Sequence, residues 1–253
     1  MIHSAHIKEE MAASGSSKNA SEEVFSHETE RIRIAYAKRI DSSLYSFWEP
    51  AQLLAVQERE RKLLSLLAAF GFAERLRSAK ILEIGCGSGL WLREFVRWGA
   101  QPENILGIDL LPERIAAAKR SSPAGISLMC QDASNLQNLP HRFDLILQAT
   151  VFTSILSSEV KIQIANQMLS ALDGSGLIVW YDFLMDNPAN ADVRGIKRQE
   201  IEQLFPNCEI HLNRVTLAPP IGRPVARVSH KLYGLASAMK PLCSHYLGIV
   251  RKK

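Results

Sequence analysis

The sequence lacks any long apolar run: no stretch approaches the roughly 18 uncharged apolar residues that a membrane span needs. Its first residues, MIHSAHIKEEMAASGSS, contain no apolar segment of the kind found in signal peptides. Cysteine is also scarce. Four are present (Cys86, Cys130, Cys208, Cys243), and they form no CxxC pair, so neither a disulfide framework nor a zinc site is indicated. We therefore expect a cytoplasmic protein without a metal site.

The chain also lacks a strong net charge, because its formal charge is only +4, but the charges are unevenly placed. Residues 1–30 hold six glutamates and two lysines, whereas residues 194–253 hold eleven Lys or Arg and three Glu. No basic run with interleaved aromatic residues is present, so we expect no nucleic-acid partner. The basic end is either a solvated face or a surface for an anionic acceptor or an anionic membrane.

Residues 1–28 are rich in Ser, Ala, Glu and Lys without apolar periodicity, which predicts a flexible N-terminal arm. Residues 29–253 have the composition of one globular domain. Helical patterns occupy residues 29–75, with a break near residues 41–50. Pro50 suits the first turn of the second helix, and Gly71 suits its end.

From residue 80 onward, short apolar runs alternate with helix-like segments. The runs that predict strands are KILEIG, NILGIDL, ISLMCQ, FDLILQA, GLIVWYDF, CEIHLNRVTLA and HYLGIVRK. This order predicts an α/β fold: a doubly wound, mostly parallel seven-stranded sheet with helices on both faces and an antiparallel last strand. Residues 218–244 are an insertion between the last two strands. Ligands of such sheets bind at the carboxyl ends of the strands.

One turn stands out, LEIGCGSGLW, because its glycines alternate directly after a predicted strand. The dinucleotide fingerprint GxGxxG would need a third glycine where Leu90 stands. No P-loop lysine is present, and Ser88 does not lie in a GxSxG nucleophile elbow. An acid, Glu83, in front of a turn without side chains favours a ligand that carries positive charge.

EIGCGSG resembles the E/DxGxGxG motif of class I S-adenosylmethionine-dependent methyltransferases, and the similarity extends over about residues 80–171. More loosely, the chain resembles uncharacterised bacterial methyltransferases of polysaccharide or natural-product type. The resemblance implies S-adenosylmethionine as the cofactor. It implies that Gly85, Cys86, Gly87 and Gly89 surround the methionine portion and that Glu83 serves the ammonium group.

The same resemblance assigns further cofactor contacts along the chain. Asp109, which ends the second predicted strand, corresponds to the acid that accepts the ribose hydroxyls, with Leu110 beside it. Asp132 and Ala133, after the third strand, correspond to the adenine site. Residues 148–152, at the end of the fourth predicted strand, should line the pocket near the sulfonium, with Gln148 as the cofactor contact among them.

Catalysis and acceptor binding are less marked in the sequence. Asp182, at the end of the fifth strand, and His230 are candidate bases for deprotonating a hydroxyl, and His211 and His245 are further candidates. The resemblance implies an N-terminal helical lid. The predicted substrate and lid residues are Tyr36, Tyr45, Trp48, Phe152, Tyr181 and Arg194.

The sequence therefore predicts a methyltransferase that acts on a small molecule or glycan precursor, by O-methylation with in-line transfer. Two alternatives stay open at this stage. One is a regulatory or scaffold protein that binds the cofactor without catalysis, and the other is a nicotinamide enzyme. Peripheral contact with a membrane is a further expectation for the basic insertion.

Overall fold

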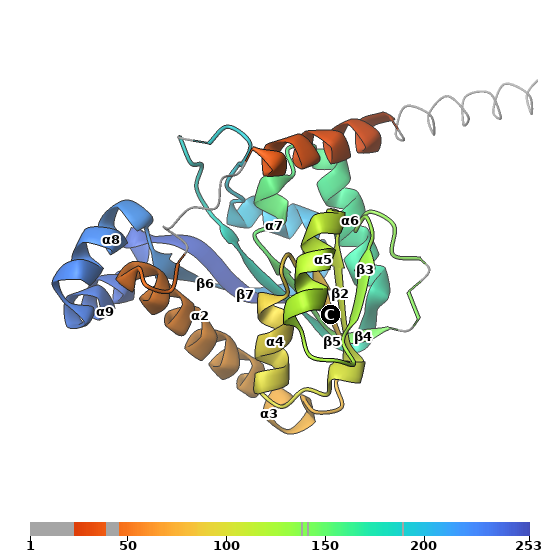
Figure 1. Ribbon diagram of the computed structural model, residues 1–253, viewed down its shortest axis with the longest axis horizontal. Coiled ribbons are helices and arrows are strands. Elements are labelled where there is room, and N and C mark those ends of the chain that lie inside the picture. The colour runs from red at the N-terminus through yellow and green to blue at the C-terminus, as the bar shows by residue number, and fades with distance from the viewer. Residues whose placement is uncertain (1–22, 39–45, 138, 141, 189) are drawn as a thin grey trace, which may run out of the picture.

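The computed structural model describes residues 23–38, 46–137, 139–140, 142–188 and 190–253 (Figure 1). Residues 23–37 are helical, so the predicted boundary at residue 28 falls inside a helix. None of the described helices is both long and apolar enough to cross a bilayer. Tyr45 lies outside the described residues.

The centre of the fold is a seven-stranded sheet with the strand order β3-β2-β1-β4-β5-β7-β6. The strands are β1 (Ile81–Ile84), β2 (Ile105–Asp109), β3 (Ser127–Cys130), β4 (Phe143–Ala149), β5 (Leu172–Phe183), β6 (Cys208–Leu217) and β7 (Cys243–Lys252). Strands β1 to β5 pair in parallel, and β7 runs antiparallel to both β5 and β6. Each strand coincides with a predicted apolar run, which confirms the predicted fold class.

Helices cover both faces of this sheet (Figure 1). They are α2 (Pro50–Ala69), α3 (Phe72–Arg75), α4 (Leu90–Arg97), α5 (Pro112–Ser121), α6 (Ser158–Ala171) and α7 (Arg198–Leu204). Short 3-10 turns lie at Pro102–Asn104, Phe152–Ser154 and Lys240–Leu242. Helix α2 begins at Pro50 and is stopped by Gly71, whose φ of 77° is readily adopted only by glycine.

Two hydrophobic cores result, one on each face of the sheet. Side chains of α6 and α7 pack on the first face, where Trp180 is fully buried. Side chains of α2, α3, α4 and α5 pack on the second face, where Tyr181 is buried. Because successive strand residues point to opposite faces, neighbours such as Trp180 and Tyr181 belong to different cores.

Between β6 and β7 the chain forms helices α8 (Pro219–Val228) and α9 (His230–Ala238). They pack against the start of α2 through a third, small cluster that includes Ala51, Leu217, Ala226 and Tyr233. Their outer side leaves apolar residues exposed, among them Val228, Leu235 and Met239. The region predicted as an insertion therefore closes one end of the sheet's carboxyl edge.

Candidate active site

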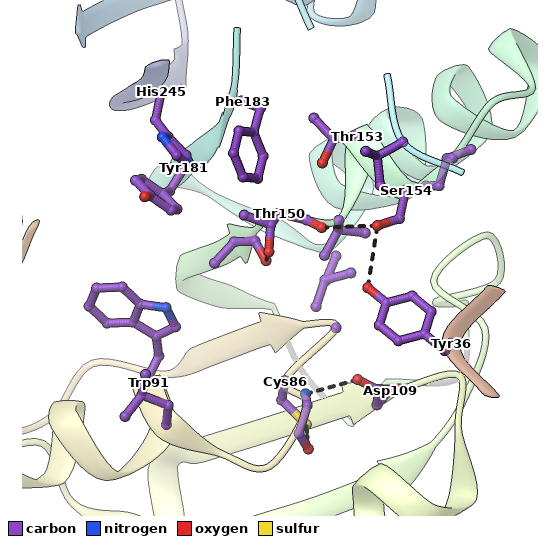
Figure 2. Close-up of a pocket in the computed structure, with 18 of the residues that line it drawn as sticks. Tyr36, Cys86, Trp91, Asp109, Thr150, Thr153, Ser154, Tyr181, Phe183 and His245 are labelled. Atoms are coloured by element: carbon purple, nitrogen blue, oxygen red, sulfur yellow. Dashed lines mark hydrogen bonds between the residues drawn. The ribbon is translucent and has the colours of Figure 1, made fainter. Parts of the chain in front are cut away.

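A pocket of about 760 Å³ lies at the carboxyl ends of β1, β2 and β4 and extends to β5, α2 and α8. Its volume is within the range of about 300–1,000 Å³ that is usual for small-molecule sites. In the order of strands across the sheet, β2 and β4 lie on opposite sides of β1, so the pocket sits at the topological switch point. Figure 2 shows its two sides, with Asp109 and Tyr36 on one and Tyr181 and His245 on the other.

The glycine turn after β1 forms the floor of the pocket. Gly85 and Gly87 have φ values of 66° and 55°, in the left-handed region that side chains disfavour. A Cβ at Gly85 would lie 2.5 Å from a methyl of Val151, whereas a Cβ at Gly87 would meet only Arg114, at 3.6 Å. The backbone at Gly87 is therefore bare toward open space, which lets a ligand approach it closely.

Glu83 is 2% exposed, and its Oε2 atom is buried without a hydrogen-bond partner. Burial, and next the nearby negative charge of Asp109, raises the pKa of Glu83 well above its usual range. An unpaired buried carboxylate is costly unless a donor or a cation completes it. Glu83 therefore fits a ligand that brings an ammonium group to the glycine turn.

Asp109 ends β2 with its carboxylate in the pocket wall. Its Oδ2 accepts the backbone N–H of Gly87 at 2.8 Å, and its Oδ1 accepts the backbone N–H of Leu111 at 2.9 Å. Burial raises the pKa of Asp109, against these two hydrogen bonds and the charge of Arg114. Each carboxylate oxygen has a second lone pair, so Asp109 retains the capacity to accept two hydroxyl groups from a ligand.

The helix over residues 23–37 lies across the pocket and is tied to the loop after β4. Glu28 pairs with Arg31 at 2.8 Å and accepts the backbone N–H of Leu156 at 2.6 Å. Thr29 donates to Asp132 at 3.2 Å. Tyr36 and Ser154 share a hydrogen bond of 3.3 Å between their hydroxyl groups, drawn in Figure 2.

Burial alone would raise the pKa of Glu28, but the hydrogen bonds from Arg31 and Leu156 hold it below its usual value. The ionised carboxylate is thus the form that fastens the helix over residues 23–37 to the loop after β4. This helix forms one wall of the pocket, the position that the predicted lid would occupy.

The far end of the pocket is built around Tyr181. The guanidinium carbon of Arg59 lies 4.9 Å from the ring centroid of Tyr181 and 5.8 Å from that of Trp91. The imidazole of His245 stacks on Tyr181 with a centroid distance of 4.8 Å and an interplanar angle of 9°. Burial, and next the positive charge of Arg59, lowers the pKa of His245 to about 3, so its neutral form is the resting one.

Most of the predicted cofactor residues line this one pocket. They are Glu83, Gly85, Cys86, Gly87, Asp109, Leu110, Asp132 and Ala133, and three predicted substrate residues line it too: Tyr36, Tyr181 and Arg194. Gly89 and Gln148 do not line it. Gly89 is the N-cap residue of α4. Gln148 is fully buried, and its Oε1 accepts the N–H of Val151 at 3.3 Å.

The two predicted catalytic residues lie outside the pocket lining. Asp182 is fully buried on the opposite face of β5 from Tyr181, because strand residues alternate. Its carboxylate accepts the Thr153 hydroxyl at 2.6 Å and the Phe183 N–H at 3.0 Å, and burial raises its pKa to about 7. His230 begins α9 and borders a separate shallow hollow near Trp48.

Two predicted aromatic contacts are likewise placed elsewhere. Trp48 is 95% exposed, and Phe152 is buried against Trp180 in the first core, with ring centroids 4.7 Å apart. Phe152 lies between Val151 and Thr153, which both line the pocket, but its own ring packs in the core. Neither side chain walls the pocket.

Several lining residues had no assigned role in the sequence interpretation, chiefly Arg59, Trp91 and Thr216. Thr150 and Thr216 have φ values of 60° and 62°, strained for β-branched residues, and such strain concentrates at functional sites. His245 was one of several candidate histidines. The predicted antiparallel last strand was the signal for it, because the start of that strand lies at the carboxyl end of β5, where His245 pairs with Phe183.

Comparison with known proteins agrees with this geometry. Residues 81–176 match the family described as a methyltransferase domain. The ubiquinone biosynthesis O-methyltransferase of Nitrobacter winogradskyi is 35% identical over 79 residues, which are 30% of this chain and 29% of the relative. That of a Bradyrhizobium species is 33% identical over 78 residues, 30% of each chain. The chain thus matches less than a third of the length of these relatives.

Solved structures share the fold over most of the chain. A methyltransferase from Clostridium acetobutylicum described as S-adenosylmethionine-dependent superposes with a TM-score of 0.56 at 15% identity, covering 78% of this chain and 91% of the other. The magnesium protoporphyrin IX methyltransferase of Synechocystis, solved with bound S-adenosylhomocysteine (SAH), superposes with a TM-score of 0.56 at 14% identity. The match covers 88% of this chain and 93% of the other. The fold is that of the class I methyltransferases, and residues 81–176 are a methyltransferase domain, which confirms the predicted resemblance.

Proposed function

We propose that the protein is an S-adenosylmethionine-dependent methyltransferase that methylates an oxygen atom of a small molecule or glycan precursor. The observation that carries this proposal is the unpaired, buried Oε2 of Glu83 beside a bare glycine turn. The pyrophosphate of a nicotinamide dinucleotide, or the phosphates of a nucleotide, would bring negative charge to the same place, next to Glu83 and Asp109. The ammonium group of the methionine portion of S-adenosylmethionine would instead donate a hydrogen bond to the unpaired oxygen of the Glu83 carboxylate.

The cofactor residues then contact different parts of S-adenosylmethionine along the pocket. Glu83 and the turn at Gly85 and Gly87 hold the methionine portion, Asp109 accepts the ribose hydroxyls, and Asp132 faces the adenine side. The bound cofactor supplies a methyl group on a sulfonium, which is already an activated leaving group. The chain's own contribution is to place the acceptor atom in line with that methyl group and to exclude water, effects worth up to about 7–11 kcal/mol.

Oxygen is the acceptor atom that the relatives support, since both matched curated proteins are named O-methyltransferases. The acceptor class is supported by the neighbours as well, because they include methyltransferases of a porphyrin and of plantazolicin, the latter at a TM-score of 0.51, 18% identity and coverage of 92% and 99%. The exposed Val228, Leu235 and Met239 beside the basic residues of α8 and α9 support the expected contact with an anionic membrane surface.

The experiment is a mass-shift screen. The purified chain is incubated with S-adenosylmethionine and a library of hydroxylated small molecules and sugars, and products gaining one methyl group are sought. Gly87→Val serves as the control because it blocks the cofactor site without touching the acceptor end. A chain that binds SAH and methylates nothing would favour the alternative of a catalytically silent cofactor-binding protein.

A further inference from the structure

The lining residues around Tyr181, which lies opposite Asp109 and Tyr36 in Figure 2, form what we call the inner chamber; they are Arg59, Trp91, Tyr181, Thr216, Tyr233 and His245. These residues come from α2, α4, β5, β6, α9 and β7, so the chamber is assembled from distant parts of the chain. None of them belongs to the cofactor motif. The chamber therefore has the position expected for the acceptor.

Arg59 is the cation of this chamber, and its surroundings are aromatic. Its guanidinium lies against the rings of Tyr181 and Trp91, and it donates toward the Tyr181 hydroxyl. Its Nε is buried without a hydrogen-bond partner, and among the described residues no carboxylate lies within ion-pair distance of it. The adjacent Glu58 is engaged elsewhere, with Lys62 and the Thr216 N–H.

A guanidinium with a free buried donor matches a planar carboxylate, which accepts two parallel N–H bonds. The faces of the aromatic rings leave room for a flat ligand body and are weak hydrogen-bond acceptors. The unpaired donor of Arg59 therefore indicates an anionic group on the molecule that enters the chamber.

The neighbours of His245 favour one tautomer. When the hydroxyl of Ser244 donates to the backbone carbonyl of Thr216 at 3.3 Å and its oxygen accepts the Nδ1–H of His245 at 2.9 Å, all three groups are paired, and we assign this arrangement. The proton is then on Nδ1, and Nε2 carries a lone pair. The imidazole ring stacks on Tyr181, with centroids 4.8 Å apart, and contacts the ring of Phe183 at a tilt of 38°, with centroids 3.9 Å apart, and these two contacts fix its plane.

We propose that the inner chamber binds a hydroxylated carboxylate as the methyl acceptor, with Arg59 holding the carboxylate and Nε2 of His245 taking the hydroxyl proton. This rests on the proposed function. The acceptor oxygen forms a bond to the methyl carbon while the carbon–sulfur bond breaks with its electron pair to sulfur. The hydroxyl proton passes to Nε2 and then to water, which restores the neutral imidazole.

The two residues also act on each other. Burial is the larger cause of the low pKa of His245, and the positive charge of Arg59 is the second; Tyr181 and Tyr233 are the other titratable side chains of the chamber. A carboxylate on Arg59 would cancel that positive charge and make Nε2 a better proton acceptor. The base thus gains strength when an anionic acceptor is in place.

The first test is direct and needs no turnover. Nitrogen-15 NMR of histidine-labelled protein, with His245 assigned by comparison with His245→Asn, should show the Nδ1–H tautomer in the SAH complex. Ser244→Ala should abolish that preference, whereas His211→Asn, at an exposed histidine, should leave the His245 signals unchanged. An Nε2–H tautomer in the parent protein would overturn the assignment of the base.

The second test uses benzoate and its neutral counterpart benzamide as probes. Calorimetry with the SAH complex should show benzoate binding about tenfold or more tightly than benzamide, as charge-assisted hydrogen bonds imply. Arg59→Gln should remove this preference, Arg59→Lys should keep part of it, and Arg61→Gln, at an exposed arginine of the same helix, should keep all of it. Benzoate should also raise the pKa of His245 in the NMR titration. Equal binding of the two probes, or no response of His245 to benzoate, would overturn the proposal.

The cofactor's own carboxylate is the other possible partner of Arg59, and a third comparison separates the two sources. The second ligand is 5′-methylthioadenosine, which lacks the amino-acid portion. If Arg59→Gln weakens the binding of SAH but not the binding of 5′-methylthioadenosine, Arg59 holds the cofactor's carboxylate and the acceptor assignment is overturned. We expect both affinities to stay within about twofold of the parent. Failure of SAH to bind the parent protein would instead refute the proposed function itself.

Discussion

The backbone N–H of Gly87 donates to Oδ2 of Asp109 at 2.8 Å, which joins the glycine turn after β1 to the acid that ends β2. The two parts of the cofactor motif are 22 residues apart in the chain and are held as one unit. A ligand that contacts the turn therefore meets the Asp109 carboxylate at a fixed position. This relationship makes both residues direct tests of the site.

Gly87→Val should leave the protein folded and abolish binding of SAH. A side chain here meets only Arg114 at 3.6 Å, and the cost of a positive φ is about 1–2 kcal/mol, less than the stability of a typical domain. The branched side chain would, however, occupy the space above the turn. Circular dichroism and calorimetry measure the two effects, and Gly174→Val, at an open position in β5, is the matched control. Full affinity in a folded Gly87→Val protein would contradict the motif assignment.

Asp109→Asn should weaken SAH binding by about 10- to 100-fold, because hydrogen bonds to charged groups contribute about 1.5–3 kcal/mol. The amide keeps one oxygen for a backbone N–H, so the turn should persist. Asp173→Asn, at a half-buried position near the start of β5, controls for the change of charge. We would abandon the ribose assignment for Asp109 if both variants bound SAH as tightly as the parent.

Glu83→Gln should stabilise the ligand-free protein at mildly alkaline pH and should weaken its binding of SAH. The pKa of Glu83 is raised on folding, so the native state binds more protons than the unfolded state above the ordinary value of 4.5. The free energy of unfolding of the parent must therefore fall as pH rises through that window. The free energy of unfolding of Glu83→Gln does not fall in this way. We expect it to exceed that of the parent by about 1–3 kcal/mol at a pH where the parent carboxyl is ionised.

Urea unfolding at mildly acidic and mildly alkaline pH measures this difference, with the exposed Glu74→Gln as the control. An identical pH dependence in Glu83→Gln and the parent would mean that Glu83 is solvated in the protein. The coupled loss of SAH affinity, read by calorimetry, distinguishes a ligand site from a purely structural buried acid.

Arg31→Ala should speed release of SAH about tenfold, because Arg31 binds both Glu28 and the backbone carbonyl of Ser154 and so ties the helix over residues 23–37 to the loop after β4. Stopped-flow displacement gives the dissociation rate. Arg33→Ala removes an exposed arginine whose distance to Glu30 is 4.0 Å and should change nothing. Equal release rates in the two variants would show that this helix does not gate the pocket.

The parts of the account that sequence could predict are those with local signals. Apolar runs located every strand, and the spacing of glycines and acids gathered Glu83, Gly87 and Asp109 into one site. Tyr181 and His245 were separate candidates in the sequence, but nothing local grouped them with Arg59, because the three residues meet only through the pairing of β5 with β7 and the packing of α2. Asp182 illustrates the same limit, since one step along β5 decides whether a side chain faces the pocket or the opposite core.

Calorimetric titration of the purified protein with SAH tests the central claim most directly. The account predicts one binding site per chain, no comparable binding of NAD or ATP, and loss of the SAH signal in Gly87→Val. Failure of the folded parent protein to bind SAH, or binding of NAD with equal affinity, would contradict it.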